Sequence, residues 1–390
     1  MIPQKIPPSQ TLALVQKVKD LKAAGEDIVS FAAGESDFDT PEWVIEKAYA
    51  SMKSGNTRYV NTQGLPELRK ALAKDIQKRS TATWVDETCI GVCAGAKQGI
   101  HLVLSAALSQ DDEVLIPAPY WVSYPGIVRA VGAQAIRFET KAENGYFPTV
   151  EELKAKKTGR TKALIFASPN NPTGDMISEK LLKEIVDWCV ENKILLIYDE
   201  LYEKLVFSDK KHFTALSMVS REQSEWVVSL NAFSKAFSMT GWRLGYFTSH
   251  PENIKALSGL QSQVLTCLPG FVQEAGVAAL ERADEYLEPI LKSFKKRRDL
   301  FMGEMAKVSG VKAHEPQAAF YVMVDVSEAM KKKGFNTDKE FVAALLEEKK
   351  VALNPASSFG VENQVRFTFS LPPEQIVEGI RRFREFVEQN

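Results

Sequence analysis

The feature that most constrains the fold is an alternation of short apolar segments and amphipathic helical patterns between residues 85 and 250. Several apolar segments are near-continuous runs of valine, isoleucine and leucine, which is typical of strands covered by helices on both sheet faces. This alternation predicts an α/β fold with a mostly parallel sheet. We expect strands at 113–116, 133–138, 162–167, 194–198 and 227–230, and a helix at 178–192.

The pattern changes after residue 281. A long charged helical segment at 284–308 is followed by isolated strands at 320–324 and 365–369, with helices at 337–348 and 373–388. This succession predicts a smaller α+β domain. Since 390 residues are many for a single core, we expect a large domain over 40–280 and a small one over 281–390.

Composition excludes several classes of function. The formal net charge is −1, so nothing indicates nucleic acid or an anionic membrane as a partner. No apolar run approaches the length of a membrane span, and the N-terminus lacks the apolar segment of a signal peptide. The histidines are scattered and the cysteines lack zinc-ligand spacing, so we expect no metal site and reduced thiols in a cytoplasmic protein. The cysteines are Cys89, Cys93, Cys189 and Cys267.

Lys235 is the strongest candidate for a chemical role. It lies in segment 229–246, among small and hydroxylic residues that include Ser234, and Arg243 follows eight positions later. A poorly solvated lysine can form a Schiff base with a carbonyl, and an arginine offers a planar fork to a phosphate. This pair favours a cofactor with both an aldehyde and a phosphate, pyridoxal 5′-phosphate. A solvated loop lysine is the alternative for this segment taken alone.

Two predicted strands end in polar residues that suit the same cofactor. Asp199 ends a buried strand, where ligands of α/β sheets bind, and a carboxylate there can keep a pyridine nitrogen protonated. Tyr202 follows three residues later and could reach the ring oxygen of the cofactor. Segment 167–174, Ala-Ser-Pro-Asn-Asn-Pro-Thr-Gly, forms a rigid turn that could present Asn171 to the ring. Taken alone, Asp199 could equally be a helix N-cap and the turn a plain connection.

Three further segments contribute. The glycine-rich segment 91–99 leads into a helical pattern and could expose backbone N–H groups to a phosphate. Trp121 offers an aromatic face to a planar ring, although core packing is a serious alternative. Arg366 lies between apolar neighbours in a predicted strand and would suit a bidentate pair with an α-carboxylate.

Together these residues resemble the fold type I, pyridoxal-phosphate-dependent aminotransferases of class I/II. The nearest subgroup resembles the bacterial aspartate aminotransferases (Iγ/Ib), some of which also use prephenate, and the resemblance runs from segment 8–11 to Arg366. It implies that Lys235 carries the cofactor, Asp199 pairs with its ring nitrogen, and Tyr202 and Asn171 lie around the ring oxygen. It also joins residues 1–39 to the small domain.

The same resemblance assigns the remaining positions. Arg243 and the backbone of Ala96 and Lys97 bind the phosphate, and Trp121 stacks on the ring. Tyr59 reaches the phosphate of the other subunit, which implies a homodimer with active sites at the subunit interface. Gly34 and Arg366 hold the substrate α-carboxylate, while Lys97, Ser9 and Thr11 help to hold a distal carboxylate.

The chain departs from the family pattern at three positions. Ala232 stands where a serine often precedes the lysine by three residues, and Ala318 and Ala356 stand where glycines are usual. None of these changes removes a catalytic group. The prephenate-using relatives also have an arginine shortly before the serine matched by Ser9, and segment 2–6 has none.

We therefore expect ping-pong transamination between aspartate and 2-oxoglutarate, with prephenate as a weaker substrate. Aminotransferases for aromatic or other amino acids remain alternatives. So does a β-lyase on the same fold, which would release ammonia and pyruvate without a 2-oxo acid acceptor. A non-catalytic regulator that binds the cofactor is disfavoured, because such proteins carry an added DNA-binding segment and basic charge.

Overall fold

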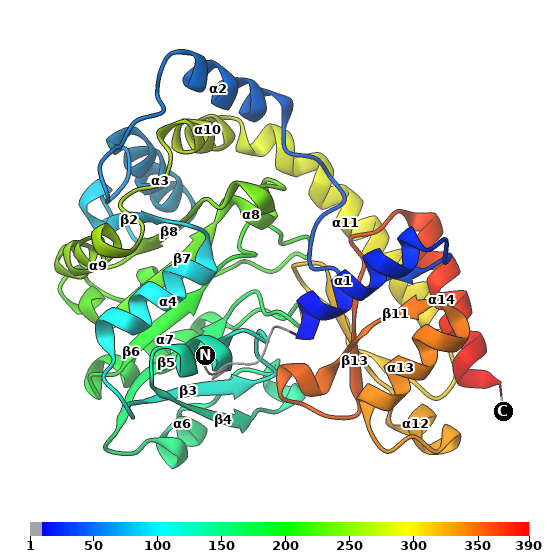
Figure 1. Cartoon of the computed structure of the whole chain (residues 1–390). Coiled ribbons are helices and arrows are strands. Elements are labelled where there is room, and N and C mark those ends of the chain that lie inside the picture. Colours follow the sequence, from blue (N-terminus) through cyan, green and yellow to red (C-terminus); the bar gives the residue numbers. More distant parts are fainter. Residues whose placement is uncertain (1–9, 390) are drawn as a thin grey trace, which may run out of the picture.

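The computed structural model describes residues 10–389, and its main feature is a seven-stranded sheet in the order β2-β8-β7-β6-β5-β3-β4 (Figure 1). Strands β7, β6, β5, β3 and β4 are mutually parallel, and β8 is antiparallel to both β2 and β7. The strands, in sheet order, are Ile90–Cys93, Gly245–Thr248, Val227–Ala232, Leu195–Asp199, Thr161–Ala167, Glu113–Ala118 and Gln134–Glu139.

Helices cover both faces of this sheet. Neighbouring residues of β5 belong to different clusters: Ile165 packs with Ile100 and Leu257, whereas Leu164 packs with Ile185. This period of two is what a strand buried on both faces requires. The covering helices are α2 (Glu42–Lys53), α3 (Pro66–Arg79), α4 (Ala96–Ala107), α5 (Tyr124–Ala130), α6 (Val150–Lys156), α7 (Glu179–Glu191), α9 (Pro251–Val264) and α10 (Gly270–Glu281).

The expected α/β pattern is confirmed, with shifts of one or two residues at most strand ends. Helix α7 starts after Ser178, whose side chain accepts from the backbone N–H of Leu181, and it ends at Asn192. The sequence analysis did not single out β2 and β8, which have only four residues each. Because β5, β6 and β7 are parallel, their carboxyl ends lie at one edge and bring Asp199 and the residues after Ala232 together.

The C-terminal part is built on a four-stranded antiparallel sheet in the order β12-β13-β10-β9. Helix α14 (Pro373–Glu388) has the expected bounds, because Pro373 suits the first helical position and its apolar face is buried at Ile376, Ile380 and Phe383. The remaining elements are β9 (Lys312–Ala313), β10 (Tyr321–Asp325), β12 (Asn354–Pro355), β13 (Gln364–Thr368), α11 (Ala283–Met305), α12 (Ser327–Lys333) and α13 (Asp338–Lys349).

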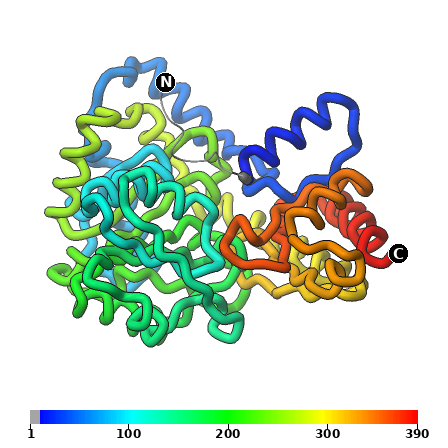
Figure 2. The backbone as a smooth tube through the Cα atoms, turned by 60° about the horizontal axis from the view of Figure 1, so that its bottom comes forward, coloured from blue at the N-terminus to red at the C-terminus, as the bar shows by residue number. Residues whose placement is uncertain are grey.

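The N-terminal segment lies with this C-terminal part, although nearly the whole sequence separates them. Strand β1 (Val29–Ser30) pairs in parallel with β11 (Val351–Ala352), and Ser370 Oγ donates to the carbonyl of Glu35 at 2.7 Å. In Figures 1 and 2, α1 (Gln10–Ala23, blue) lies beside the orange and red elements, apart from the green helices. Within residues 10–389, no helix is long and apolar enough to cross a membrane.

Candidate active site

The polar residues singled out in the sequence gather at the carboxyl edge of the seven-stranded sheet. Asp199 is the last residue of β6, and Lys235 lies in the short helix α8 (Phe233–Ala236) that follows β7. Ser234, beside Lys235, is buried. Strands β6 and β7 are hydrogen-bonded neighbours, so the fold itself brings the lysine and the carboxylate to one site.

The amine of Lys235 is held by a backbone carbonyl from the N-terminal segment. Its Nζ donates to the carbonyl oxygen of Gly34 at 2.6 Å. Burial lowers the pKa of this amine to about 8; the charge of Glu35 raises it, and those of three cations, Arg366, Arg243 and Lys97, lower it further. The lowered pKa makes the neutral amine, the form that attacks a carbonyl carbon, far more accessible near neutral pH than in an ordinary lysine.

Asp199 is a buried carboxyl group with no cation beside it among the described residues. Its Oδ2 accepts from the hydroxyl of Tyr124 at 2.8 Å, and its Oδ1 accepts from the backbone N–H of Leu201 at 3.1 Å. Burial raises its pKa to about 6, although both hydrogen bonds act in the opposite direction. A cation placed next to this carboxylate would be strongly favoured.

A cradle for an anion lies at the N-terminus of α4. Gly95 is the N-cap residue of this helix, and its φ of 80° is a conformation that suits glycine. Because glycine has no side chain, no side-chain hydrogen bond caps the first N–H groups of the helix. The guanidinium of Arg243 lies so close to Gly95 that a Cβ there would be 2.4 Å from Nη2. Backbone N–H groups, including that of buried Ala96, and a guanidinium at one helix N-terminus are suited to a phosphate.

Arg366 is a buried guanidinium that no carboxylate pairs with in the described part of the chain. Nη1 donates to Asn171 Oδ1 and Nη2 to the carbonyl of Ala32, both at 3.0 Å, while buried Nε has no partner. The guanidinium also lies 4.4 Å from the ring centre of Tyr321. Burial lowers its pKa. An unpaired charge in this position is costly unless an anionic ligand joins it.

Two tyrosines connect these groups. The hydroxyls of Tyr202 and Tyr321 are 2.8 Å apart, and burial raises the pKa of both above the usual value. A Cβ at Gly34 would lie 2.8 Å from the Tyr321 hydroxyl, so glycine is needed for this close approach. The chain segments that carry Gly34, Asn171, Tyr202 and Arg366 thus meet around Lys235.

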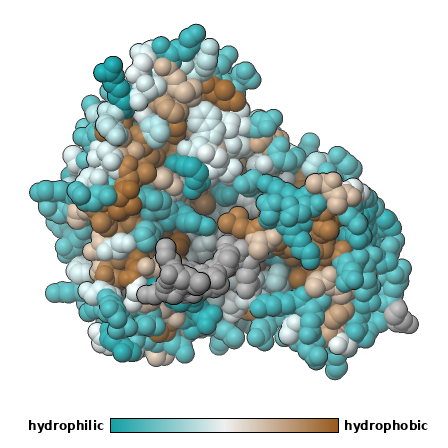
Figure 3. Space-filling view, viewed as in Figure 1, coloured by the Kyte–Doolittle hydropathy of each residue, from teal (hydrophilic) through white to brown (hydrophobic). Residues whose placement is uncertain are grey.

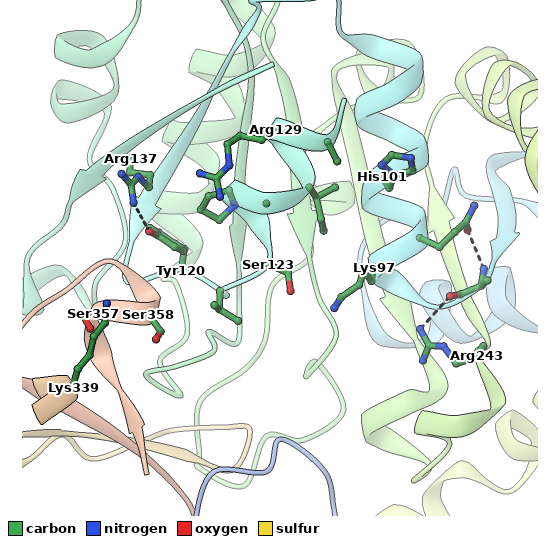
Figure 4. Close-up of a pocket in the computed structure, with 17 residues that line it drawn as sticks. Lys97, His101, Tyr120, Ser123, Arg129, Arg137, Arg243, Lys339, Ser357 and Ser358 are labelled. Atoms are coloured by element: carbon green, nitrogen blue, oxygen red, sulfur yellow. Dashed lines mark hydrogen bonds between the residues drawn. The ribbon is translucent and has the colours of Figure 1, made fainter. Parts of the chain in front are cut away.

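Lys97, whose ammonium lies over the ring of Trp121, is a second cation of the site besides Arg366. The ammonium of Lys97 lies 5.0 Å from the centre of the Trp121 ring, and burial and the charge of Arg243 lower its pKa. Thr11 is half-buried in the first turn of α1, and Ser9 lies outside the described residues. Figure 4 shows Lys97 and Arg243 on one side of a cavity, with Ser123 opposite Lys97.

Tyr59 does not join this group. Its side chain is 87% exposed, more than any other large hydrophobic residue in the described range. The three departures lie at turns: Ala232 ends β7, Ala356 follows β12, and Ala318 donates its N–H to the carbonyl of Gly174 at 3.0 Å. Ala318 therefore packs against the turn that holds Asn171.

Sequence reasoning missed two tyrosines that belong to the site. Tyr124 lies in the same aromatic segment as Trp121, three residues later, and Tyr321 follows Phe320 directly. Both lie in aromatic segments that the sequence shows plainly, which is the only signal it offers. Their partners, Asp199 for Tyr124 and Tyr202 for Tyr321, are distant in sequence. The histidines are scattered in the sequence, yet the fold brings His212 Nε2 to 2.8 Å from Oε1 of Glu200, the residue after Asp199. With Glu203 they form a cluster in which both glutamates are buried and His212 is partly buried.

The arrangement fits pyridoxal phosphate by three independent features. The amine of Lys235 suits the aldehyde, the cation-free carboxylate of Asp199 suits a protonated ring nitrogen, and the cradle of Gly95 and Arg243 suits the phosphate. Trp121 contributes an aromatic ring packed edge-on against Tyr124, with ring centres 5.5 Å apart. These groups come from four separate segments, which makes a coincidental match improbable.

Comparisons with known proteins agree with this geometry. The family aminotransferase class I and II matches residues 26–383. The chain is 38% identical over 384 residues to a probable aspartate/prephenate aminotransferase of Aquifex aeolicus, covering 98% of this chain and 96% of that one. It is 38% identical over 383 residues to the aspartate aminotransferase of Bacillus subtilis, covering 98% and 97%.

Solved structures show the same fold. Aspartate aminotransferase from Thermus thermophilus with maleate superimposes with a TM-score of 0.92 at 34% identity, covering 99% of this chain and 100% of that one. The enzyme from Rhizobium meliloti gives 0.93 at 30% identity, covering 100% and 99%. The chain thus belongs to the class I and II aminotransferases, fold type I enzymes whose cofactor is pyridoxal 5′-phosphate.

Proposed function

We propose that the protein transfers the amino group of aspartate to 2-oxoglutarate. The observation that carries this proposal is the charge around Lys235: Arg366, Arg243 and Lys97 all act on its amine, and none forms an ion pair among the described residues. Glu35 alone opposes them. Three such cations suit an anionic cofactor together with a substrate that carries two carboxylates.

The roles follow from position. Bound pyridoxal phosphate supplies an aldehyde for the amino acid and a ring that withdraws electrons from Cα. Nζ of Lys235 would take the proton from substrate Cα, since a pKa of about 8 suits a base that works near neutral pH. Asp199 would hold a proton on the ring nitrogen of the cofactor, and Tyr202 and Asn171 would lie by the ring oxygen.

Binding and orientation fall to the cations. Arg366 pairs with the substrate α-carboxylate, and its unpartnered Nε leaves a donor free for this purpose. Ala96, Ser234 and Arg243 would hold the phosphate, and Trp121 would stack on the ring. Gly34, whose carbonyl accepts a hydrogen bond from Nζ of Lys235, would lie beside the substrate α-carboxylate.

Selection for a dicarboxylate rests on Lys97, with Ser9 and Thr11. Lys97 is the cation on the Trp121 side of the site, away from Arg366. An apolar side chain would leave the ammonium of Lys97 without an anionic partner, and such a group is costly to bury. Several relatives named above act on aspartate or on aspartate and prephenate. Segment 2–6, where an arginine would favour prephenate, lies outside the described residues, but its sequence contains no arginine, so prephenate stays the weaker candidate.

We propose further that the active protein is a homodimer. Tyr59 is 87% exposed, Val264 66% and Tyr49 58%, an unusual exposure for large apolar side chains. In the view of Figure 3, hydrophobic residues are exposed on the surface of the part that carries the seven-stranded sheet. A second copy covering these residues would bring Tyr59 to the partner's phosphate site.

The division into domains is also a proposal. Residues 40–280 form the large domain with the cofactor site, and residues 1–39 are assigned to the small domain of 281–390. The β1–β11 pair and the Ser370–Glu35 hydrogen bond support this assignment for the described part of the segment. Unpaired cysteines, three of them buried, support a cytoplasmic location.

One experiment tests the proposed reaction. The purified protein, loaded with pyridoxal phosphate, is incubated with aspartate and 2-oxoglutarate, and oxaloacetate and glutamate are measured. We expect oxaloacetate and glutamate in equal amounts. When 2-oxoglutarate is omitted, the reaction should stop after at most one oxaloacetate per active site, and no glutamate should form. The Lys235→Ala variant is the control and should form neither product at a comparable rate.

A further inference from the structure

The cavity that contains Lys97 and Arg243 extends well beyond the site described above. It has a volume of about 640 Å³ and lies between the carboxyl edge of the seven-stranded sheet and the C-terminal part (Figure 4). Its described lining includes five lysine and arginine residues and no aspartate or glutamate. These cations are Lys97, Arg129, Arg137, Arg243 and Lys339.

Three of the five cations lie in the outer half of the cavity. Arg129 comes from α5, Arg137 from β4 and Lys339 from α13. In the view of Figure 4, both arginines are drawn above Tyr120 and Lys339 below it, and Ser123 is drawn between this group and Lys97. We call Arg129, Arg137 and Lys339 the outer cations.

No carboxylate in the described chain pairs with the outer cations. All three are exposed, and the single polar contact among them is a 3.4 Å hydrogen bond from Arg137 Nη1 to the hydroxyl of Tyr120. The neighbouring carboxylate of Asp338 is engaged elsewhere, because it accepts the backbone N–H of Ser357 at 2.7 Å. Like charges facing one crevice repel one another unless an anion lies between them.

A hydroxyl group adds a second feature of an anion site. Oγ of Ser357, which also lines the cavity, is buried and has no hydrogen-bond partner within residues 10–389. A buried hydroxyl without a partner is costly and is usually satisfied by a ligand or water. Guanidinium groups bind carboxylates and phosphates through two parallel hydrogen bonds, so Arg129 and Arg137 are well suited to a dianion.

We propose that the outer cations and Ser357 form a second anion subsite, separate from the positions of the cofactor phosphate and the substrate side chain. Its ligand is a small dianion, either a dicarboxylic acid or inorganic phosphate. Arg129 and Arg137 belong to the part with the seven-stranded sheet, and Lys339 and Ser357 to the C-terminal part. A bound dianion therefore bridges the two parts, and a dicarboxylate that binds there before catalysis is held near Lys97. The dicarboxylate role rests on the proposed function, whereas the phosphate role does not.

The test compares three forms of the holoenzyme. Arg129→Gln/Arg137→Gln removes two charges from the cavity, and Lys154→Gln/Lys156→Gln removes two exposed charges from α6, outside it. Binding of inorganic phosphate is measured by calorimetry with pyridoxal phosphate in place, so that the cofactor site is occupied. We expect the arginine variant to bind phosphate about fivefold more weakly and the lysine variant to bind it as the wild type does. Equal phosphate affinity in all three forms overturns the proposal.

A kinetic arm distinguishes the two ligands. kcat/KM is measured for 2-oxoglutarate and for pyruvate, which has one carboxylate. If the subsite serves the substrate, the arginine variant should lose about fivefold with 2-oxoglutarate and little with pyruvate. Weaker phosphate binding without this loss supports the subsite and assigns it to free phosphate.

A third variant tests the hydroxyl group. Ser357→Ala, which keeps all charges, should also weaken phosphate binding. Failure of any of these tests leaves the proposed transamination itself unaffected.

Discussion

The hydroxyl of Tyr124 donates a 2.8 Å hydrogen bond to Oδ2 of Asp199. Tyr124 begins α5 and Asp199 ends β6, and both side chains are buried. The bond stabilises the ionised carboxylate and so offsets part of the burial that raises its pKa to about 6. Tyr124 thus positions the carboxylate that we propose pairs with the cofactor ring.

Tyr124→Phe should lower kcat by about tenfold, equivalent to ~1.4 kcal/mol. Without the hydroxyl, the pKa of Asp199 rises, so activity should be lost at a higher pH as the solution is acidified. The measurement is kcat against pH for both forms. Tyr198→Phe is the matched control, because this buried hydroxyl donates to the carbonyl of Phe213 instead. An acid limb at the same pH in wild type and Tyr124→Phe would contradict the positioning role.

Asp199→Ala should retain pyridoxal phosphate but slow proton removal from the substrate by about a thousandfold, since roughly 4 kcal/mol of transition-state stabilisation is lost. Asp199→Asn separates this role from a structural one. Asparagine can still accept the N–H of Leu201, which Asp199 accepts at 3.1 Å, but carries no charge. Single-turnover rates with aspartate should fall in both variants; near-normal turnover in Asp199→Asn would assign the residue to the turn alone.

Lys235 should capture the cofactor as a neutral amine with a pKa of about 8. The rate at which apoenzyme takes up pyridoxal phosphate should therefore rise with pH and reach its half-maximum near pH 8. The folded amine is neutral between pH 8 and 10.5 while the unfolded one is charged, so Lys235 should also add to apoenzyme stability as the pH rises through this range. Borohydride reduction and digestion should place the pyridoxyl group on Lys235, and a label on another lysine would refute this.

Much of the fold follows from local patterns in the sequence. Helix α14 has the expected bounds because its first-turn proline and its apolar periodicity lie within the helix itself. Asp199 could be placed at the sheet edge because β6 is a continuous apolar run that ends there. The bonds of Tyr124 to Asp199 and of Arg366 to Ala32 could not be derived, since they join residues 75 and 334 positions apart. Such contacts depend on how the layers pack.

Lys97→Ala should lower kcat/KM for aspartate more than for alanine or phenylalanine, by about tenfold, because only aspartate has a distal carboxylate for the ammonium to meet. The ammonium also lies over Trp121, so loss of that contact affects all donors alike. The ratio of kcat/KM values for aspartate and alanine separates the two effects. An equal loss for every donor would mean that Lys97 serves the phosphate or the fold.

An amino-donor screen against 2-oxoglutarate tests the central claim most directly. Holoenzyme is assayed with each common amino acid, and prephenate is tested as an alternative acceptor, with glutamate, ammonia and pyruvate measured separately. The charges around Lys235 predict the highest kcat/KM for aspartate. Glutamate should form, and no ammonia should be released. A preferred aromatic or aliphatic donor would contradict the dicarboxylate assignment, and ammonia and pyruvate released without any 2-oxo acid acceptor would contradict transamination.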